Sequence, residues 1–179
     1  TGKKVSIPDL FCNCSGKPVH NYSVTKPSSN VQYFACHDGL TLHDSIVNNI
    51  PLDESTEEGK IEAVNRLKLA NALLLTSQGI AFLHAGQERG RTKTAFTTAG
   101  TDDCETIGNF VKNSYDSSDN INNFVWNISD LNKDLLEYTK NLISLRKNNS
   151  AFTISTQDEV MTRISLLGEY CDDFFMAYK

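Results

Sequence analysis

Residues 31–44 read V-Q-Y-F-A-C-H-D-G-L-T-L-H-D, a short apolar run that ends in His37, Asp38 and Gly39. Residues 31–37 are mainly β-branched, aromatic or small, without regular polar alternation, which predicts a parallel strand buried on both faces. Gly39 allows the chain to turn sharply after that strand. An imidazole and a carboxylate at the tip of a buried strand indicate a site of chemistry.

The next part of the chain predicts a helix followed by a second strand. Ser55 and Glu58 match a capping box, and the apolar residues that follow, up to Leu74, recur at helical spacing. Residues 77–79 (S-Q-G) end this helix, and residues 80–86 (I-A-F-L-H-A-G) predict a second buried strand after almost no loop. We therefore expect a βαβ unit whose helix covers the sheet.

The remaining segments differ in character. Residues 1–30 have the composition of loops and turns, and after the second strand a loop of about forty residues precedes a helix predicted over residues 130–148. Residues 160–167 and 174–178 are strand-like. Two βα units with polar groups after the strands are typical of a (β/α)8 barrel or a doubly wound sheet. A full barrel has eight strands and about 250 residues, so we expect this chain to be part of something larger.

Composition excludes several classes of protein. The net charge of −5 and the pI near 5.3 provide no basic stripe for nucleic acid, and no stretch approaches the about 20 apolar residues of a membrane span. Five cysteines are too scattered for a disulfide framework. Cys12 and Cys14 lack a second Cys/His pair at ligand spacing, so we assign no metal.

Four motifs, in order, resemble those of one enzyme family. Residues 36–44 (C-H-D-G-L-T-L-H-D) are similar to the H-D-[NG]-x-T-L-x-D segment at the seventh barrel strand of the debranching enzymes of glycoside hydrolase family 13. Residues 75–88 resemble their L-x-S-Q-G-x-P-F-x-x-A-G-x-E run, and residues 142–147 their L-I-x-L-R-K. Residues 113–126 resemble the N-S-Y-x-S-x-D-x-x-N-x-x-x-W stretch of type I pullulanases, which is therefore the closest group.

The chain departs from the pullulanase pattern at a few positions. Gly39 stands where many pullulanases have Asn and isoamylases have Gly, and Ala81 replaces the usual Pro. Residues 89–90 (R-G) replace Phe-Leu, and Val125 takes a place often held by Asp. An isoamylase-type debranching enzyme is accordingly an alternative.

The resemblance implies an α/β fold: a partial (β/α)8 TIM barrel with strands and helices 7 and 8, followed by the start of an all-β sandwich domain. Residues 1–30 would be an irregular lead and loop segment. Residues 31–149 would form the C-terminal part of the catalytic barrel, and residues 150–179 the beginning of the C-terminal β domain.

The resemblance also implies a function, the retaining hydrolysis of α-1,6-glucosidic branch linkages in pullulan, amylopectin or limit dextrins. Asp38 would stabilise the transition state by hydrogen-bonding the sugar ring in the −1 subsite, and His37 would donate to the same sugar. Tyr115, Asp119 and Asn122 would bind substrate, although Asp119 and Asn122 also suit an Asx turn or helix cap and Tyr115 could anchor its loop. The nucleophile and the general acid would lie on strands four and five, outside these residues, so we expect the chain alone to be inactive.

Partners and alternatives follow from the same resemblance. We expect a branched α-glucan substrate, association with the missing N-terminal part of the barrel or self-association, and neither nucleic acid nor membrane. No cofactor is implied, calcium stays open for a full-length enzyme, and an extracellular or cell-surface location is favoured. Two other classes compete: a non-catalytic glucan-binding remnant, and a metal-dependent phosphohydrolase whose His-Asp dyad would need further histidine ligands.

Overall fold

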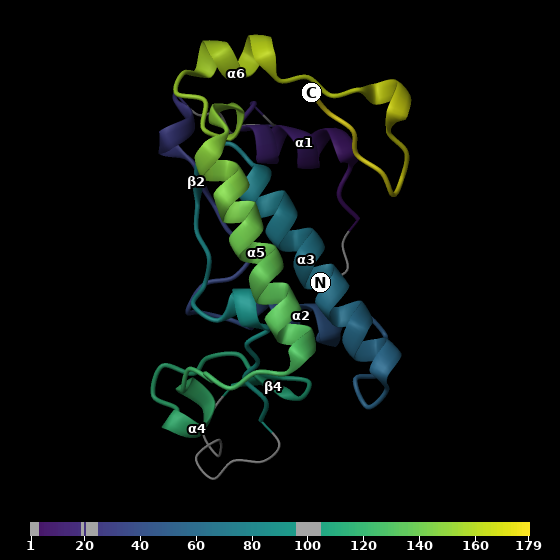
Figure 1. The fold of residues 1–179 in the computed structure, drawn as a ribbon, viewed down its shortest axis with the longest axis vertical. Helices are drawn as coiled ribbons and strands as arrows, with labels where there is room; N and C mark the ends of the chain where they lie inside the picture. The colour runs from purple at the N-terminus through teal and green to yellow at the C-terminus, as the bar shows by residue number, and fades with distance from the viewer. Residues whose placement is uncertain (1–3, 19, 21–24, 96–104) are drawn as a thin grey trace. The chain divides into compact units, whose positions relative to one another are not determined.

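A computed structural model describes residues 4–18, 20, 25–95 and 105–179 (Figure 1). These residues divide into two compact units. The first unit comprises the described residues up to Gln32 together with Leu73–Phe82 and Leu142–Lys179. The second comprises Tyr33–Ala72 and the described part of Leu83–Asn141. No helix in these described ranges has the length and apolar character needed to cross a bilayer.

The predicted βαβ unit is present in shortened form. Strand β1 (Val31–Gln32) pairs in parallel with β2 (Ile80–Ala81), and helix α3 (Glu57–Thr76) lies between them in sequence. The expected strands over 31–37 and 80–86 are thus too long, and the prediction that they are buried on both faces is wrong here, because Val31 and Ile80 are each 50% exposed. A parallel strand is buried by its neighbours, and among the described residues this sheet has two strands.

Helix α3 begins one residue later than the capping-box pattern predicts. Thr56, not Ser55, precedes the helix, and its Oγ1 accepts a hydrogen bond from Gly59 N at 3.1 Å. Ser55 instead donates its hydroxyl to Asp53 Oδ1 at 2.6 Å. The S-Q-G signal for the end of the helix is correct. Gly79 has φ +96°, and a Cβ there would lie 2.6 Å from the carbonyl oxygen of Asn30.

Helix α2 (Leu42–Asn49) was not predicted, since its polar sequence hides the pattern. Thr41 caps it by accepting a hydrogen bond from Asp44 N at 3.1 Å. Its first residue, Leu42, is buried in the core of the second unit. That core also contains Ala35, Val64, Leu67 and Leu135.

Residues 1–30 are not wholly irregular, which corrects the expectation for this segment. Helix α1 (Ile7–Ser15) is capped by Ser6, whose hydroxyl accepts from Asp9 N at 3.2 Å, and ends at Gly16 with φ 71°. Pro8 suggested a loop, but it lies in the first turn, where its missing N–H costs no helical hydrogen bond. A short 3₁₀ turn, η1 (Pro27–Ser29), then leads into β1.

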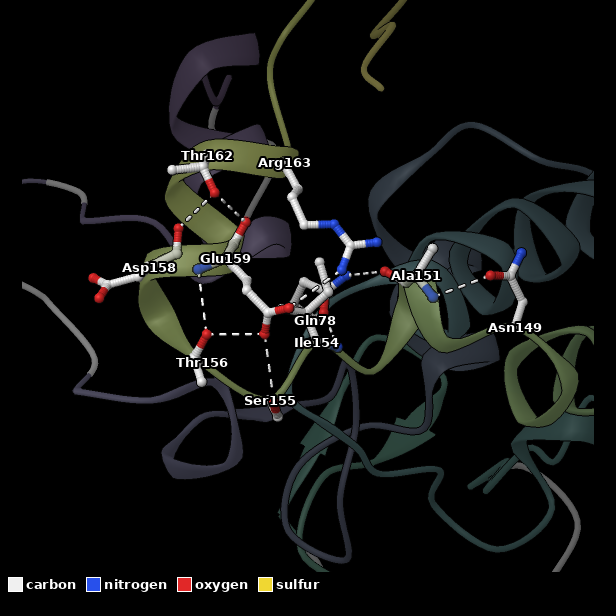
Figure 2. Close-up of polar contacts among 10 residues, drawn as sticks. All are labelled: Gln78, Asn149, Ala151, Ile154, Ser155, Thr156, Asp158, Glu159, Thr162 and Arg163. Atoms are coloured by element: carbon white, nitrogen blue, oxygen red, sulfur yellow. Dashed lines mark hydrogen bonds and ion pairs between the residues drawn. The ribbon is translucent and has the colours of Figure 1, made fainter.

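The strand-like runs at 160–167 and 174–178 are also corrected. Residues up to Arg163 belong to helix α6 (Gln157–Arg163), and the described pairing in the tail is one bridge between Leu166 and Tyr178. Figure 2 shows why: Thr156 Oγ1 accepts from Glu159 N at 3.3 Å and donates to its carboxylate at 2.9 Å. This capping contact starts a helix despite the β-branched residues. The assignment of 150–179 to a β domain stays a prediction.

Gln78 and Arg146 fix the chain after the two long helices. The Gln78 side chain is 3% exposed, donates to Ala151 O at 2.7 Å and accepts from Ile154 N at 3.0 Å (Figure 2). Arg146 lies on helix α5 (Asp130–Asn148), whose bounds match the predicted helix. Its guanidinium donates to three carbonyl oxygens just beyond or at the end of α3, those of Leu75, Ser77 and Gly79. The first unit has its own core, formed by Phe11, Ile154, Val160 and Ile164.

The long loop of the second unit contains small elements. They are the 3₁₀ turn η2 (Gln87–Arg89), the antiparallel strands β3 (Thr106–Ile107) and β4 (Phe110–Val111), and the one-turn helix α4 (Asp119–Asn122). Two further 3₁₀ turns, η3 (Ser150–Phe152) and η4 (Gly168–Tyr170), belong to the first unit.

Candidate functional site

The turn at His37, Asp38 and Gly39 presents its two polar side chains to solvent. The His37 side chain is 84% exposed and that of Asp38 76%, with Nε2 of the imidazole 3.5 Å from Oδ2 of the carboxylate. Gly39 has φ +76°, a conformation that L side chains rarely adopt. The structure therefore places this predicted pair where both groups can contact a ligand.

A buried lysine lies behind the turn. Lys93 is 2% exposed, and its Nζ donates to Gly39 O at 2.7 Å, to Ser114 Oγ at 3.3 Å and to Lys112 O at 3.5 Å. Burial lowers the pKa of Lys93, while the charge of Asp44 acts in the opposite direction. Sequence reasoning missed this residue, because a lysine in a polar loop is normally exposed.

The backbone beside Lys93 is held by a fully buried carboxylate. Asp44 is 0% exposed, and its two oxygens accept hydrogen bonds from Thr92 Oγ1 at 2.5 Å and from Lys93 N at 2.9 Å. The aspartate lies in the first turn of α2, close after the His37 turn in sequence. Its position in the motif was visible in the sequence, but its burial was not.

His43, next to Asp44, forms a second buried charged group. The ring lies between two carboxylates, with Nδ1 3.2 Å from Asp44 Oδ1 and Nε2 2.8 Å from Glu54 Oε1. Burial lowers the pKa of His43, but the hydrogen bonds and charges of the two carboxylates outweigh it and raise the pKa to about 9. His43 is therefore protonated at neutral pH, 13% exposed, and acts as a cationic support for α2.

The other predicted binding residues lie on the loop around α4. Tyr115 is 83% exposed, and Asp119 is exposed in the first turn of α4. Asn122 is half-buried, and its Nδ2 donates to Ser114 O at 2.5 Å and to Ser117 O at 3.0 Å. The amide nitrogen of Asn122 thus holds the loop together. Lys93 connects this loop to the His37 turn through Ser114.

His84 contributes to the electrostatics of the same region. His84 lies in the segment 80–86 that the sequence predicts as a buried strand, yet it is only half-buried. Burial lowers the pKa of His84, and the positive charges of Arg91, Lys93 and His37 lower it further. The lowered pKa therefore favours the neutral imidazole next to these side chains.

Three adjacent residues of the turn could hold a metal ion. One donor atom from each of Cys36, His37 and Asp38 lies within 4.8 Å of the others, and this is the one such group found among the described residues. A structural zinc site uses four protein ligands. The second histidine-rich group that a metal-dependent phosphohydrolase would need does not appear in the described part of the chain.

A separate hollow of about 220 Å³ is lined by residues that include Arg89, Phe124 and Val125. The guanidinium of Arg89 lies 5.2 Å from the ring centre of Phe124 and 5.6 Å from that of Trp126, and donates to Trp126 O at 2.6 Å. Trp126 is 78% exposed. The Trp126 side chain is therefore largely exposed, and Arg89, which lines the hollow, contacts both its ring and its carbonyl oxygen.

Comparison with known proteins places this site in context. No family model matches the chain. In sequence it is similar to pullulanase A of Streptococcus pneumoniae, with 43% identity over 93 residues, which are 52% of this chain and 7% of that protein. In structure it is similar to the Group B Streptococcus pullulanase SAP in complex with maltotetraose, with a TM-score of 0.85 and 33% identity, covering 99% of this chain and 26% of that chain.

The chain is pullulanase-like. A third relative is the type I pullulanase of Bacillus subtilis complexed with maltose, with a TM-score of 0.76 and 28% identity over 94% of this chain and 21% of that chain. The resemblance predicted from the sequence, to debranching enzymes and among them to type I pullulanases, is confirmed. The pullulanase-like chain spans about a quarter of the two streptococcal SAP chains, 24% and 26%, and 21% of the Bacillus subtilis chain. It accordingly corresponds to part of a larger fold, with mixed helices and few strands.

Proposed function

We propose that this pullulanase-like chain is part of a glycoside hydrolase that cleaves α-1,6-glucosidic branch linkages in pullulan, amylopectin or limit dextrins. One observation carries the proposal: His37 and Asp38 are exposed on a turn that follows a parallel strand and is fixed from behind by a buried lysine. Catalytic groups of (β/α)8 barrels lie after the carboxyl ends of parallel strands. The relatives named above support the reaction class.

In this proposal β1 and β2 are barrel strands seven and eight, and α3 and α5 are the helices that follow them. Residues 31–149 then form the C-terminal part of the barrel, residues 1–30 precede it, and residues 150–179 begin a C-terminal β domain. The parallel pairing of Val31 with Ile80 supports adjacent strand positions.

The proposed mechanism is retaining. A nucleophile and a general acid, both outside these residues, act on one glycosidic bond about 5 to 5.5 Å apart. Asp38 hydrogen-bonds the hydroxyls of the sugar in the −1 subsite and stabilises positive charge as the oxocarbenium-like transition state develops. His37 donates to the same sugar, and neither residue attacks the substrate.

The loop around α4 supplies further glucan contacts in this proposal. Tyr115 offers an exposed ring face, and Asp119 an exposed carboxylate. Asn122 uses its amide nitrogen to hold the loop, so its contact with sugar comes from the amide oxygen. The complex of the Group B Streptococcus pullulanase with maltotetraose suggests the ligand to use.

Two measurements on the purified chain test this proposal. We expect no release of reducing ends from pullulan, because the nucleophile and general acid are missing. We also expect maltotetraose to shift the NMR resonances of the His37 ring and the Tyr115 amide but not those of the buried His43 ring. Hydrolysis by the chain alone would show that it holds a complete catalytic set and would overturn the inactive assignment.

A matched pair of variants identifies the carboxylate involved. Asp38→Asn should abolish the maltotetraose-induced shifts, because the amide replaces one acceptor oxygen with a donor. Asp116→Asn changes an exposed aspartate next to Tyr115 and should leave them intact. Equal shifts in both variants would exclude Asp38 as a glucan contact.

A further inference from the structure

We infer that Lys93 is a positioning residue that fixes the turn of His37, Asp38 and Gly39 relative to the loop that contains Ser114 and Tyr115. The inference rests on the proposed glucan site, because it names the group that keeps the two halves of that site together. Lys93 touches no substrate in this account. It acts through the backbone of Gly39 and through Ser114.

The contacts of the Lys93 ammonium explain this role. Its three protons match three acceptors, Gly39 O, Ser114 Oγ and Lys112 O, at 2.7, 3.3 and 3.5 Å. Gly39 directly follows Asp38 in sequence, and Ser114 directly precedes Tyr115. One charged group therefore sets the distance between two segments more than 70 residues apart in the chain, since 114 minus 39 is 75.

The position of Lys93 is fixed from its own backbone. Asp44, fully buried, accepts from Lys93 N at 2.9 Å and from the adjacent Thr92 hydroxyl at 2.5 Å. The lysine stem thus starts from a rigid point and extends through a buried path to the acceptors. Buried ammonium groups are costly unless their hydrogen bonds are satisfied, so the completed set of three acceptors is what makes this arrangement stable.

An uncharged side chain of similar length cannot donate the hydrogen bonds that Lys93 donates. In Lys93→Met the volume is nearly kept, but Gly39 O and Ser114 Oγ both lose their shared donor. The two segments should then move independently while the core around Leu135, which is 0% exposed, stays packed. Hydrogen bonds to charged groups are stronger than those between neutral groups, so their loss should have a measurable local effect.

The first experiment uses the sugar-free chain and ¹⁵N relaxation. In the wild-type chain we expect order parameters of about 0.85 at Gly39 and Ser114, and in Lys93→Met values below about 0.6 at both, with Leu135 unchanged. Lys112→Met is the matched control, because the side chain of Lys112 is exposed and pairs with Glu105 at 2.5 Å. Wild-type order at Gly39 and Ser114 in Lys93→Met would overturn the inference.

The second experiment adds maltotetraose and separates the two proposals. Lys93→Met should bind it at least about tenfold more weakly than Lys112→Met, as expected for the loss of one charged hydrogen bond. If the wild-type chain shows no response to maltotetraose, the proposed glucan site fails, while the relaxation result still decides the role of Lys93. If Lys93→Met binds as tightly as the control, the inference fails and the glucan site stands.

A second variant covers the case in which Lys93→Met does not fold. Ser114→Ala removes one acceptor and keeps the ammonium. It should therefore lower the backbone order parameters at positions 114 and 115 but leave that of Gly39 unchanged. Equal loosening of Gly39 and Ser114, or of neither, would contradict a shared lysine contact. The comparison needs no substitution of Lys93 itself.

Discussion

At the level of single residues, three buried charged side chains, those of Asp44, Lys93 and His43, hold the second unit together around the His37 turn. Asp44 is completely buried, and hydrogen bonds from Thr92 and Lys93 satisfy its oxygens. A buried carboxylate without such partners would be strongly unfavourable. His43 adds a positive charge against it, so this part of the second unit is stabilised by a closed set of charged hydrogen bonds.

The raised pKa of His43 makes stability depend on pH. Its pKa in the folded chain is about 9 and its ordinary value is 6.5, so the stabilisation is fully present below about pH 6.5 and is lost as pH rises through about 9. We expect the free energy of unfolding, measured with urea, to fall by on the order of 2 kcal/mol between pH 6 and pH 10 because of this group.

Two variants isolate the His43 contribution. His43→Gln should remove most of that pH dependence, because glutamine carries no proton to lose. His20→Gln changes a histidine whose side chain is 79% exposed and should retain the pH dependence. A His43→Gln chain with the same slope as the wild type would rule out His43 as its source.

At the level of the elements, short capping contacts decide where helices begin. The sequence predicts Ser55 as the cap of α3, whereas the structure uses Thr56. Both residues carry hydroxyl groups, and Asp53 captures that of Ser55. Local competition for a hydrogen-bond partner therefore selects between two equivalent candidates.

This competition gives a direct prediction. Thr56→Ala should lower the free energy of unfolding by about 1 kcal/mol, because Gly59 N loses its partner. Ser55→Ala should cost less than about 0.5 kcal/mol, since it changes an exposed hydroxyl outside the helix. Urea unfolding of both variants provides the comparison, and a larger loss for Ser55→Ala would restore Ser55 as the cap.

Elements differed in how well the sequence predicted them. The bounds of α5 were predicted at both ends, because its leucines recur at helical spacing and its opposite face is polar, which is the pattern of an amphipathic helix. Residues 160–163, part of the run 160–167, were predicted as strand-like, because Val160 and Thr162 favour β structure. The Thr156–Glu159 capping contact outweighed that preference. Helix α2 was missed because its polar residues resemble a loop.

At the level of the whole molecule, the sheet of β1 and β2 has two strands in the part of the chain that the structure describes, so each strand there has one edge that pairs with no other strand. Val31 and Ile80, both in the first unit, are each 50% exposed, and open apolar strand edges recruit other strands. We therefore predict that the purified chain self-associates as its concentration rises, unless a complementary part of a barrel is supplied. Size-exclusion chromatography with light scattering measures this.

A charge on the sheet edge tests the cause of the association. Val31→Lys should shift the chain toward monomer, because a lysine on an edge strand opposes strand addition. Val5→Lys changes a valine of similar exposure, 54%, outside the sheet and should leave the association unchanged. A wild-type chain that stays monomeric at all concentrations would contradict the prediction.

The sequence by itself determined the βαβ unit, the bounds of α5 and the resemblance to pullulanases, and it singled out His37 and Asp38 as a polar pair after the first strand. These properties depend on the spacing of residues close together in the sequence and on contiguous sequence motifs. The site assignments of Tyr115, Asp119 and Asn122 stay predictions, with Asn122 also holding its loop.

Only the tertiary structure decided what supports the site. The sequence shows Lys93 and Asp44 as two ordinary charged residues 49 positions apart, and it shows Ser114 as one serine among several. Their burial and mutual hydrogen bonds arise when α2, the segment after η2 and the loop after β4 pack together. Such contacts depend on the three-dimensional path of the backbone, which residue types and their spacing do not specify.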